Sequence, residues 1–143
     1  MEFEIKDGKG NIKEYSDCGI LIFEGDYLNG KRNGKGKEYD YYNGKLIFEG
    51  EYLNGEKNGK GKEYNYNDKL IYEGECLNGK GKEYDNDKLI FDGEYLNGEY
   101  NGKGKEYIND ELIFEGDYLN GKKWNGKGKK YDYINGELKY NKY

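Results

Sequence analysis

Apolar and polar residues alternate along this chain with a period of two. In the segment 46–52, Phe48 and Tyr52 fall on one face of an extended chain. Glu49 and Glu51 fall on the other face. This alternation is typical of a β-strand with one buried face. Glycine recurs every few residues, which argues against helix. The pattern therefore predicts an all-β protein.

The strand pattern recurs, which indicates a repeat protein. A phrase Leu-Ile-Phe/Tyr-Glu/Asp-Gly begins at Leu21, Leu46, Leu70, Leu89 and Leu112, so successive copies start 25, 24, 19 and 23 residues apart. Each copy continues, with small changes, into Asn-Gly-Lys-Gly-Lys-Glu-Tyr. Incomplete copies at both ends would act as the caps that stacked repeats need. We expect one domain over 1–143, divided into a partial repeat at 1–19, repeats at 20–44, 45–68, 69–87, 88–110 and 111–136, and a cap at 137–143.

Turn signals separate the predicted strands. Asn-Gly is the strongest short hairpin signal, because a type I′ turn needs positive φ at both central residues. We expect it between copies at 43–44 and 135–136, with Asn-Asp in the same place at 67–68, 86–87 and 109–110. A second turn is expected within each copy, around 30–33, 55–58, 78–79, 98–101 and 121–125. Tyr39 then pairs with Phe48, and an odd link length predicts a bulge or a three-residue turn near 67–68.

Two strands per copy predict the architecture. We expect an elongated, single-layer antiparallel β-meander of tandem hairpins, with roughly 11–12 strands. The terminal strands of such a sheet have open edges, which predicts homodimers that form end to end.

The repeated aromatic residues share one face of the predicted sheet. A glycine follows the first ring of each copy by two positions and should leave room for a ring to lie against the backbone. The rings either line a groove for a protein partner or only stack on one another to hold a one-layer sheet together. The candidate groove residues are Phe23, Tyr27, Phe48, Tyr52, Tyr72, Phe91, Tyr95, Phe114 and Tyr118.

Composition argues against disorder and against most enzyme chemistry. The 18 Tyr, 5 Phe and 1 Trp supply apolar surface that a disordered segment lacks. The chain has no His, which excludes Ser-His-Asp and Cys-His catalysis and His-ligated metals. The acidic residues that recur beside each ring are expected to face solvent, and the two cysteines are expected to be free thiols. We predict no catalytic residue, no metal site and no cofactor.

Charge placement adds a second candidate surface. The net charge of -5 disfavours a nucleic-acid partner, yet the within-copy turns should bring lysines together along one long edge. Such an edge either keeps the sheet soluble or contacts anionic phospholipid. The edge residues are Lys31, Arg32, Lys122, Lys123, Trp124 and Lys127. The N-terminus has no apolar leader, so we expect a cytoplasmic protein, free or associated with the cytoskeleton or a membrane.

These features resemble the MORN repeat (membrane occupation and recognition nexus), whose signature is Tyr/Phe-x-Gly followed by Gly-x-x-x-Gly-x-Gly. The segments 23–25 and 30–36 match it. Further matching copies begin at Phe48, Phe91 and Phe114, whereas the copy at Tyr72 departs from the signature by a deletion. The resemblance implies a twisted β-meander with an aromatic groove, scaffolding between proteins at cytoskeletal or membrane-apposed structures, and lipid binding in some members.

The resemblance favours one function and leaves two alternatives. We predict a non-catalytic scaffold or adaptor that binds a protein through the aromatic groove. One alternative is a membrane-apposed adaptor that binds anionic lipid through the lysine edge. The other is an antitoxin-like or ligand-sequestering protein, because the linker 42–46 is similar to a bacterial antitoxin-type variant of the repeat.

Overall fold

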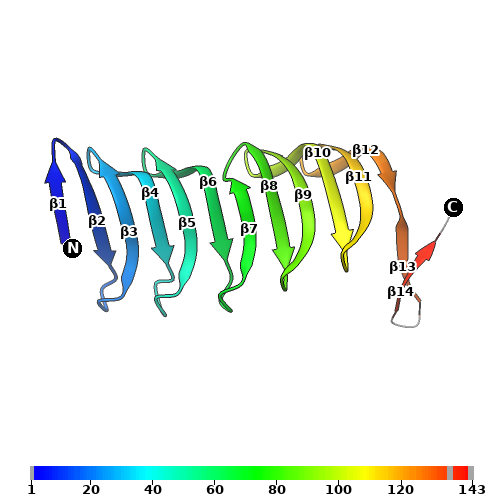
Figure 1. Ribbon diagram of the computed structural model, residues 1–143, viewed down its shortest axis with the longest axis horizontal. Coiled ribbons are helices and arrows are strands. Elements are labelled where there is room, and N and C mark those ends of the chain that lie inside the picture. Colours follow the sequence, from blue (N-terminus) through cyan, green and yellow to red (C-terminus); the bar gives the residue numbers. More distant parts are fainter. Residues whose placement is uncertain (1, 135–136, 142–143) are drawn as a thin grey trace.

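The computed structural model describes residues 2–134 and 137–141, with side-chain positions for residues 7–129. In this part of the chain, twelve antiparallel strands form one open sheet in which neighbours in sequence are neighbours in space (Figure 1). They are β1 (Glu2–Lys6), β2 (Lys9–Tyr15), β3 (Leu21–Leu28), β4 (Lys31–Tyr39), β5 (Leu46–Leu53), β6 (Glu56–Tyr64), β7 (Leu70–Glu75), β8 (Gly79–Asp85), β9 (Lys88–Leu96), β10 (Glu99–Ile108), β11 (Glu111–Leu119) and β12 (Lys122–Gly128). A separate hairpin is formed by β13 (Lys130–Ile134) and β14 (Glu137–Asn141). The predicted all-β meander is confirmed.

The turns within copies are formed by the Asn-Gly of each Leu-Asn-Gly. In the first full copy, Leu28 pairs with Lys31 around Asn29-Gly30, whose φ angles are 49° and 78°. The same turn recurs at 54–55, 97–98 and 120–121. Each of these turns starts one residue earlier than the predicted range and is shorter. The reason is that Asn-Gly supplies the two consecutive positive φ angles that a type I′ turn requires. The third copy differs: a link over residues 76–78 joins β7 to β8.

The links between copies follow the sequence prediction in three places and differ in one. Two-residue turns at 86–87 and 109–110 are confirmed, as is a three-residue turn over 66–68, which the Asn65 N–H closes by donating to the Lys69 carbonyl. The predicted two-residue turn at 43–44 is wrong. The loop there covers 40–45, because the Asp40 carboxylate accepts two backbone N–H bonds inside it.

That wider loop changes one predicted pair. Tyr39 lies opposite Leu46, and Phe48 lies opposite Glu38. The expected turn at 135–136 lies outside the described residues.

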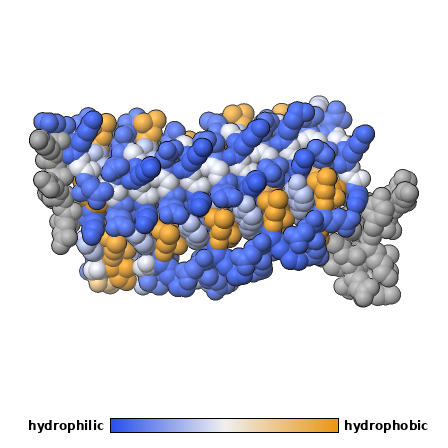
Figure 2. Space-filling model, in the orientation of Figure 1, coloured by the Kyte–Doolittle hydropathy of each residue, from blue (hydrophilic) through white to orange (hydrophobic). Residues whose placement is uncertain are grey.

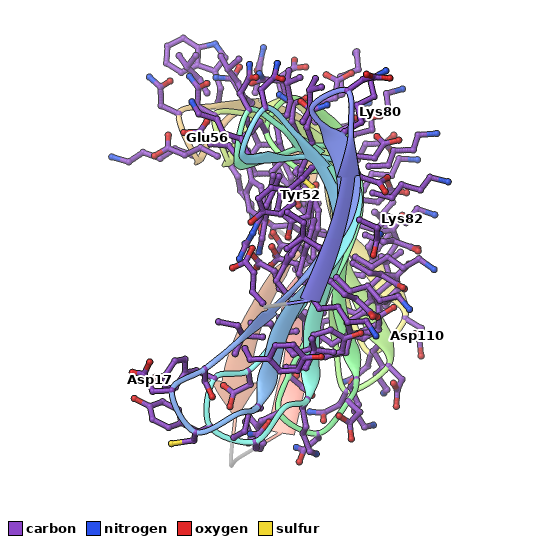
Figure 3. All side chains as sticks on the ribbon, turned by 90° about the vertical axis from the view of Figure 1, so that its left-hand side faces the viewer. Asp17, Tyr52, Glu56, Lys80, Lys82 and Asp110 are labelled. Carbon is purple, nitrogen blue, oxygen red and sulfur yellow. The ribbon has the colours of Figure 1, made fainter. Side chains whose placement is uncertain are left out.

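Regular bulges bend the sheet. Each between-copy pairing shifts register after a glutamate, as between Glu38 and Tyr39. A second shift follows the within-copy turn in four copies, whereas β7 pairs with β8 without one. In the first full copy, Gly25 pairs with Gly36 and Tyr27 with Arg32, so a step of two residues on β3 corresponds to a step of four on β4. Bulges increase local bend and twist. Seen along its long axis, the sheet is a C (Figure 3), with Tyr52 on the concave side and Lys80 and Lys82 on the convex side.

A row of glycines crosses ten strands in register. The predicted role of these residues is confirmed: a Cβ placed on Gly50 would lie 2.6 Å from Phe48 Cζ and 2.7 Å from the Cα of Gly61. The glycines therefore let aromatic rings lie directly against the backbone. The row consists of Gly25, Gly36, Gly50, Gly61, Gly74, Gly81, Gly93, Gly104, Gly116 and Gly126.

Candidate functional site

The nine predicted groove rings pack in two clusters on the concave face, and most of them are not open to solvent. Phe23 and Phe48 are 0% exposed, and Phe91 is 1% exposed. Three tyrosines complete the buried set, namely Tyr52, Tyr95 and Tyr118. Tyr27, Tyr72 and Phe114 are partly buried against these clusters. Edge-to-face contacts such as Phe23–Tyr52, with centroids 5.4 Å apart, hold the rings together. The rings are thus the core of the one-layer sheet.

A side chain from the following strand covers the first ring of four copies. The Arg32 guanidinium lies 3.9 Å from the centroid of Phe23, and Lys57 Nζ lies 4.1 Å from that of Phe48. Tyr100 stacks on Phe91 with centroids 3.8 Å apart. In the last copy, Lys123 lies 4.6 Å from the centroid of Phe114. We call these four residues (Arg32, Lys57, Tyr100 and Lys123) the covers.

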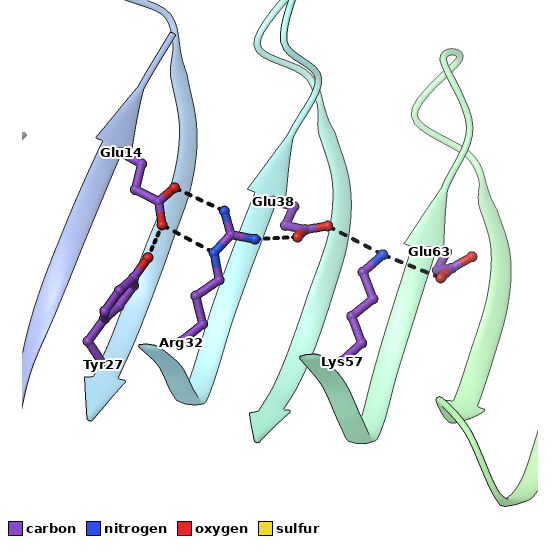
Figure 4. Close-up of polar contacts among 6 residues, drawn as sticks. All are labelled: Glu14, Tyr27, Arg32, Glu38, Lys57 and Glu63. Atoms are coloured by element: carbon purple, nitrogen blue, oxygen red, sulfur yellow. Dashed lines mark hydrogen bonds and ion pairs between the residues drawn. The ribbon is translucent and has the colours of Figure 1, made fainter. Parts of the chain in front are cut away.

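The covers also bind glutamates that alternate with the rings across the sheet. Arg32 bridges Glu14 at 3.0 Å and Glu38 at 2.6 Å. Lys57 continues the row, with its Nζ 3.3 Å from Glu38 and 3.6 Å from Glu63 (Figure 4). At the other end, Tyr100 donates to Glu83 at 2.8 Å and Lys123 lies 2.7 Å from Glu106.

Tyrosine hydroxyls supply further donors to these glutamates. Tyr27 donates to Glu14, Tyr95 to Glu83 and Tyr118 to Glu106. Burial alone would raise the pKa of Glu14, but the hydrogen bonds from Arg32 and Tyr27 hold that pKa below its ordinary value. Glu14 is therefore a charged carboxylate in a partly buried network.

Three members of the predicted lysine edge lie elsewhere. Arg32 and Lys123 are covers of the concave face, because the bulge after each within-copy turn brings them over the rings. Lys127 lies opposite Glu115 within the strand pairing of β11 and β12. The other three members are exposed: Lys31 and Lys122 directly follow a within-copy turn, and Trp124 is 72% exposed.

A comparison with protein families identifies this repeat. The MORN repeat model matches residues 23–44, 48–68 and 91–111. The chain belongs to the MORN-repeat family. Each match starts at a first ring that is almost fully buried and covered. No curated protein matches the chain. MORN repeats generally mediate interactions with proteins or membranes, and the repeat is not a catalytic unit. Within residues 2–134 and 137–141, the structure contains no helix that is long and apolar enough to cross a membrane.

The third MORN copy differs from its neighbours. It has Cys76 where the other copies have tyrosine, and its short link lacks a residue at the cover position. Glu63 has 42% of its side chain exposed, compared with 20% for Glu14, 21% for Glu38 and 24% for Glu106. The four-residue deletion is visible in the sequence and signals that this copy differs. The sequence does not show, however, that the deletion removes a cover.

The convex face carries an alternating row of charges, which sequence reasoning did not anticipate. Its members pair in register across the sheet: Lys13, Glu24, Lys37, Glu49, Lys62, Glu73, Lys82, Asp92, Lys105, Glu115 and Lys127. A long shallow groove runs beside this row, floored by the glycines, and Figure 2 shows it as a pale band between hydrophilic margins. Most lysines of the repeat therefore have carboxylates on the neighbouring strands.

Tyrosines also bind the glutamates of this charged row. Tyr39 donates to Glu24, and Tyr64 to Glu49, each at 2.6 Å. The acidic residues that the sequence placed at the surface are thus part of a hydrogen-bonded surface lattice.

Proposed function

We propose that this MORN protein is a non-catalytic protein-binding scaffold whose partner lies along the concave face and its within-copy turns. The observation that carries the proposal is a row of exposed leucines beside those turns. Leu53, Leu77, Leu96 and Leu119 are 38–49% exposed. Because the meander places every within-copy turn on the same long edge, the leucines form a repeating apolar rim about 9.6 Å apart, or two strand spacings.

Several features support this reading. An apolar row that recurs in register is a partner surface more often than scattered single residues are. The rings beneath the concave face fix the shape of the sheet, so a partner would bind a preformed surface at low conformational cost. A partner that folds over the edge of the within-copy turns would then meet the leucine rim and, on the concave side, the covers and the glutamates, while the predicted groove rings support the covers from below.

The test compares two matched pairs of substitutions in the protein used as bait with a lysate of its source. One variant carries Leu53→Ser and Leu96→Ser on the rim. The control carries Ile47→Ser and Ile90→Ser, which remove two similarly exposed aliphatic side chains at 36% and 37% exposure, from the opposite ends of the same strands. We expect the rim variant alone to lose its captured protein. Retention by the rim variant, or loss only in the isoleucine variant, would contradict the proposal.

A second candidate function is membrane contact at Trp124. An indole that is 72% exposed beside Lys122 suits a membrane interface. The pairing of most convex-face lysines with carboxylates argues for a local contact and against a broad one. Vesicles with 30% phosphatidylserine should bind the protein at low salt and should not bind a Lys122→Glu, Trp124→Ala variant. Lys123 is left intact because it is a cover. Equal binding of both proteins would remove this candidate.

A further inference from the structure

Among the five full copies, within the residues whose side chains the structure describes, the third copy is the one that lacks a cover. Leu53 and Lys60 are seven positions apart, whereas the corresponding Leu77 and Lys80 are three apart, so four residues are missing. In the second copy the same four positions include Lys57. The ring below the gap is Tyr72, which is only partly buried, in contrast to the fully buried and covered Phe48.

The carboxylates that a cover would meet are still in place. Glu63 and Glu83 lie opposite Tyr72 on the two neighbouring strands, as Glu14 and Glu38 lie opposite Phe23. Among the described residues, the ion-pair partner of Glu63 is Lys57, at 3.6 Å. The tyrosine donor found in other copies is replaced here by Cys76. Glu63 therefore has spare acceptor capacity next to an uncovered ring.

The filled copies show what kind of group fits this place. Arg32 combines a 3.9 Å approach to a ring centroid with ion pairs of 2.6 Å and 3.0 Å to the flanking carboxylates. Lys57 and Lys123 satisfy the same two requirements with an ammonium group. A cation that contacts both an aromatic face and a carboxylate is favoured by both interactions.

We infer that the third copy is a subsite for an arginine side chain of the partner protein, which completes the row of covers. This inference rests on the proposed function, because it assumes that the partner lies along the concave face. The guanidinium stacks on Tyr72 and donates to Glu63, on the pattern of Arg32. Arginine fits better than lysine because its planar fork can lie on a ring and bind a carboxylate with two N–H groups at once. Tyr72 is held in position for this contact, since its hydroxyl donates to the Glu75 carbonyl at 2.5 Å.

The structure provides a variant that fills the gap from within. Insertion of Gly-Glu-Lys-Asn between Asn78 and Gly79 reproduces the sequence of the second copy and supplies an internal lysine cover. A second variant, Glu63→Gln, removes the carboxylate without changing the side-chain size. Asp110→Asn is its control. It makes the same charge change in the turn between β10 and β11, at a φ of 66° that asparagine tolerates.

The binding experiment uses two synthetic pentapeptides, acetyl-Gly-Ser-Arg-Ser-Gly-amide and its citrulline counterpart, titrated into 15N-labelled protein. The arginine peptide should shift the amide signals around Tyr72 and Cys76, and citrulline should weaken binding at least tenfold, because the charge-assisted hydrogen bonds are lost. Glu63→Gln should weaken arginine binding about tenfold. The insertion should abolish it, and Asp110→Asn should leave it unchanged.

Two results would overturn the subsite. One is equal binding of the arginine and citrulline peptides, and the other is undiminished arginine binding to both the insertion and Glu63→Gln variants. The scaffold proposal is tested separately by the rim variant. If the rim variant loses its captured protein while the arginine peptide does not bind, the scaffold proposal is supported and the arginine subsite is refuted. If the variants bind the arginine peptide with the predicted ranking of affinities while the rim variant keeps its partner, the rim is refuted as the partner surface.

Discussion

Replacement of Gly50 by alanine should strongly destabilise the sheet, because this position has no room for a methyl group. A Cβ on Gly50 would lie 2.6 Å from Phe48 Cζ and 2.7 Å from both the Gly61 Cα and the Lys60 carbonyl oxygen. Two of these three atoms belong to the backbone of the next strand. The ring cannot move aside easily, because Phe48 is fully buried and covered by Lys57.

The expected magnitude follows from two opposing effects. Alanine loses less backbone entropy than glycine in a strand, which favours the substitution by about 0.5–1 kcal/mol. Overpacking of a well-packed core typically costs about 1–3 kcal/mol, and contact with backbone atoms places this site at the upper end. We expect a net loss of about 2 kcal/mol or more, which corresponds to a fall in Tm of about 4–8 °C for a protein of this size.

The assay is urea and thermal denaturation followed by far-UV circular dichroism, with Gly128→Ala as the control. Gly128 also lies in a strand, but its nearest neighbours, Phe114 Cδ2 and the Ile113 carbonyl oxygen, would be 3.0 Å and 3.2 Å from a new Cβ. That contact is tight but can relax by small shifts, so the control should stay within about 1 kcal/mol of the wild type. A Gly50→Ala protein as stable as the wild type or the control would refute the reasoning that the glycine row exists for close packing.

Three further outcomes are expected. Burial, together with the hydrogen bond to Glu49, raises the pKa of Tyr64 to about 12, so the stability that Tyr64 contributes is present below pH 10 and is lost as pH rises through 12. Alkaline denaturation curves of the Tyr64→Phe variant should show a smaller loss of stability over this pH range. Burial raises the pKa of Glu14, but its hydrogen bonds to Arg32 and Tyr27 outweigh burial and lower that pKa, so the free energy of unfolding should fall as pH drops below about 4.3. If Glu14→Gln leaves the dependence of stability on acid pH unchanged, the assignment is contradicted. In the described sheet β1 pairs only with β2, so light scattering should detect concentration-dependent dimers, and a monomer at every concentration would end that prediction.

Much of the fold could be predicted from the sequence because the repeat encodes local information several times over. The period of two gave the strands, and five similar phrases gave the meander. The glycine two residues after each ring correctly indicated close packing. The turn at 43–44 was misplaced because Asn-Gly competes there with Asp40, whose carboxylate organises a longer loop. A sequence motif ranks local turn geometries, but it does not include a side chain three residues away.

The candidate site was less predictable than the fold. Period-two alternation shows that rings share a face, yet it does not show whether that face is open or covered. In the sequence, Arg32 and Lys123 look like members of a lysine-rich edge. In the structure they lie over Phe23 and Phe114, because the bulges after the within-copy turns fold the ends of the strands toward the concave side.

The sequence by itself determined the strands, their order and the face on which the rings and glycines lie, since these depend on local periodicity. Only the tertiary structure decided which charges pair, which cations cover the rings and where the cover is missing. Those contacts join residues on different strands, such as Arg32 with Glu14, whose distance depends on register shifts that accumulate across the sheet. A shift of one residue would move every such side chain to the opposite face.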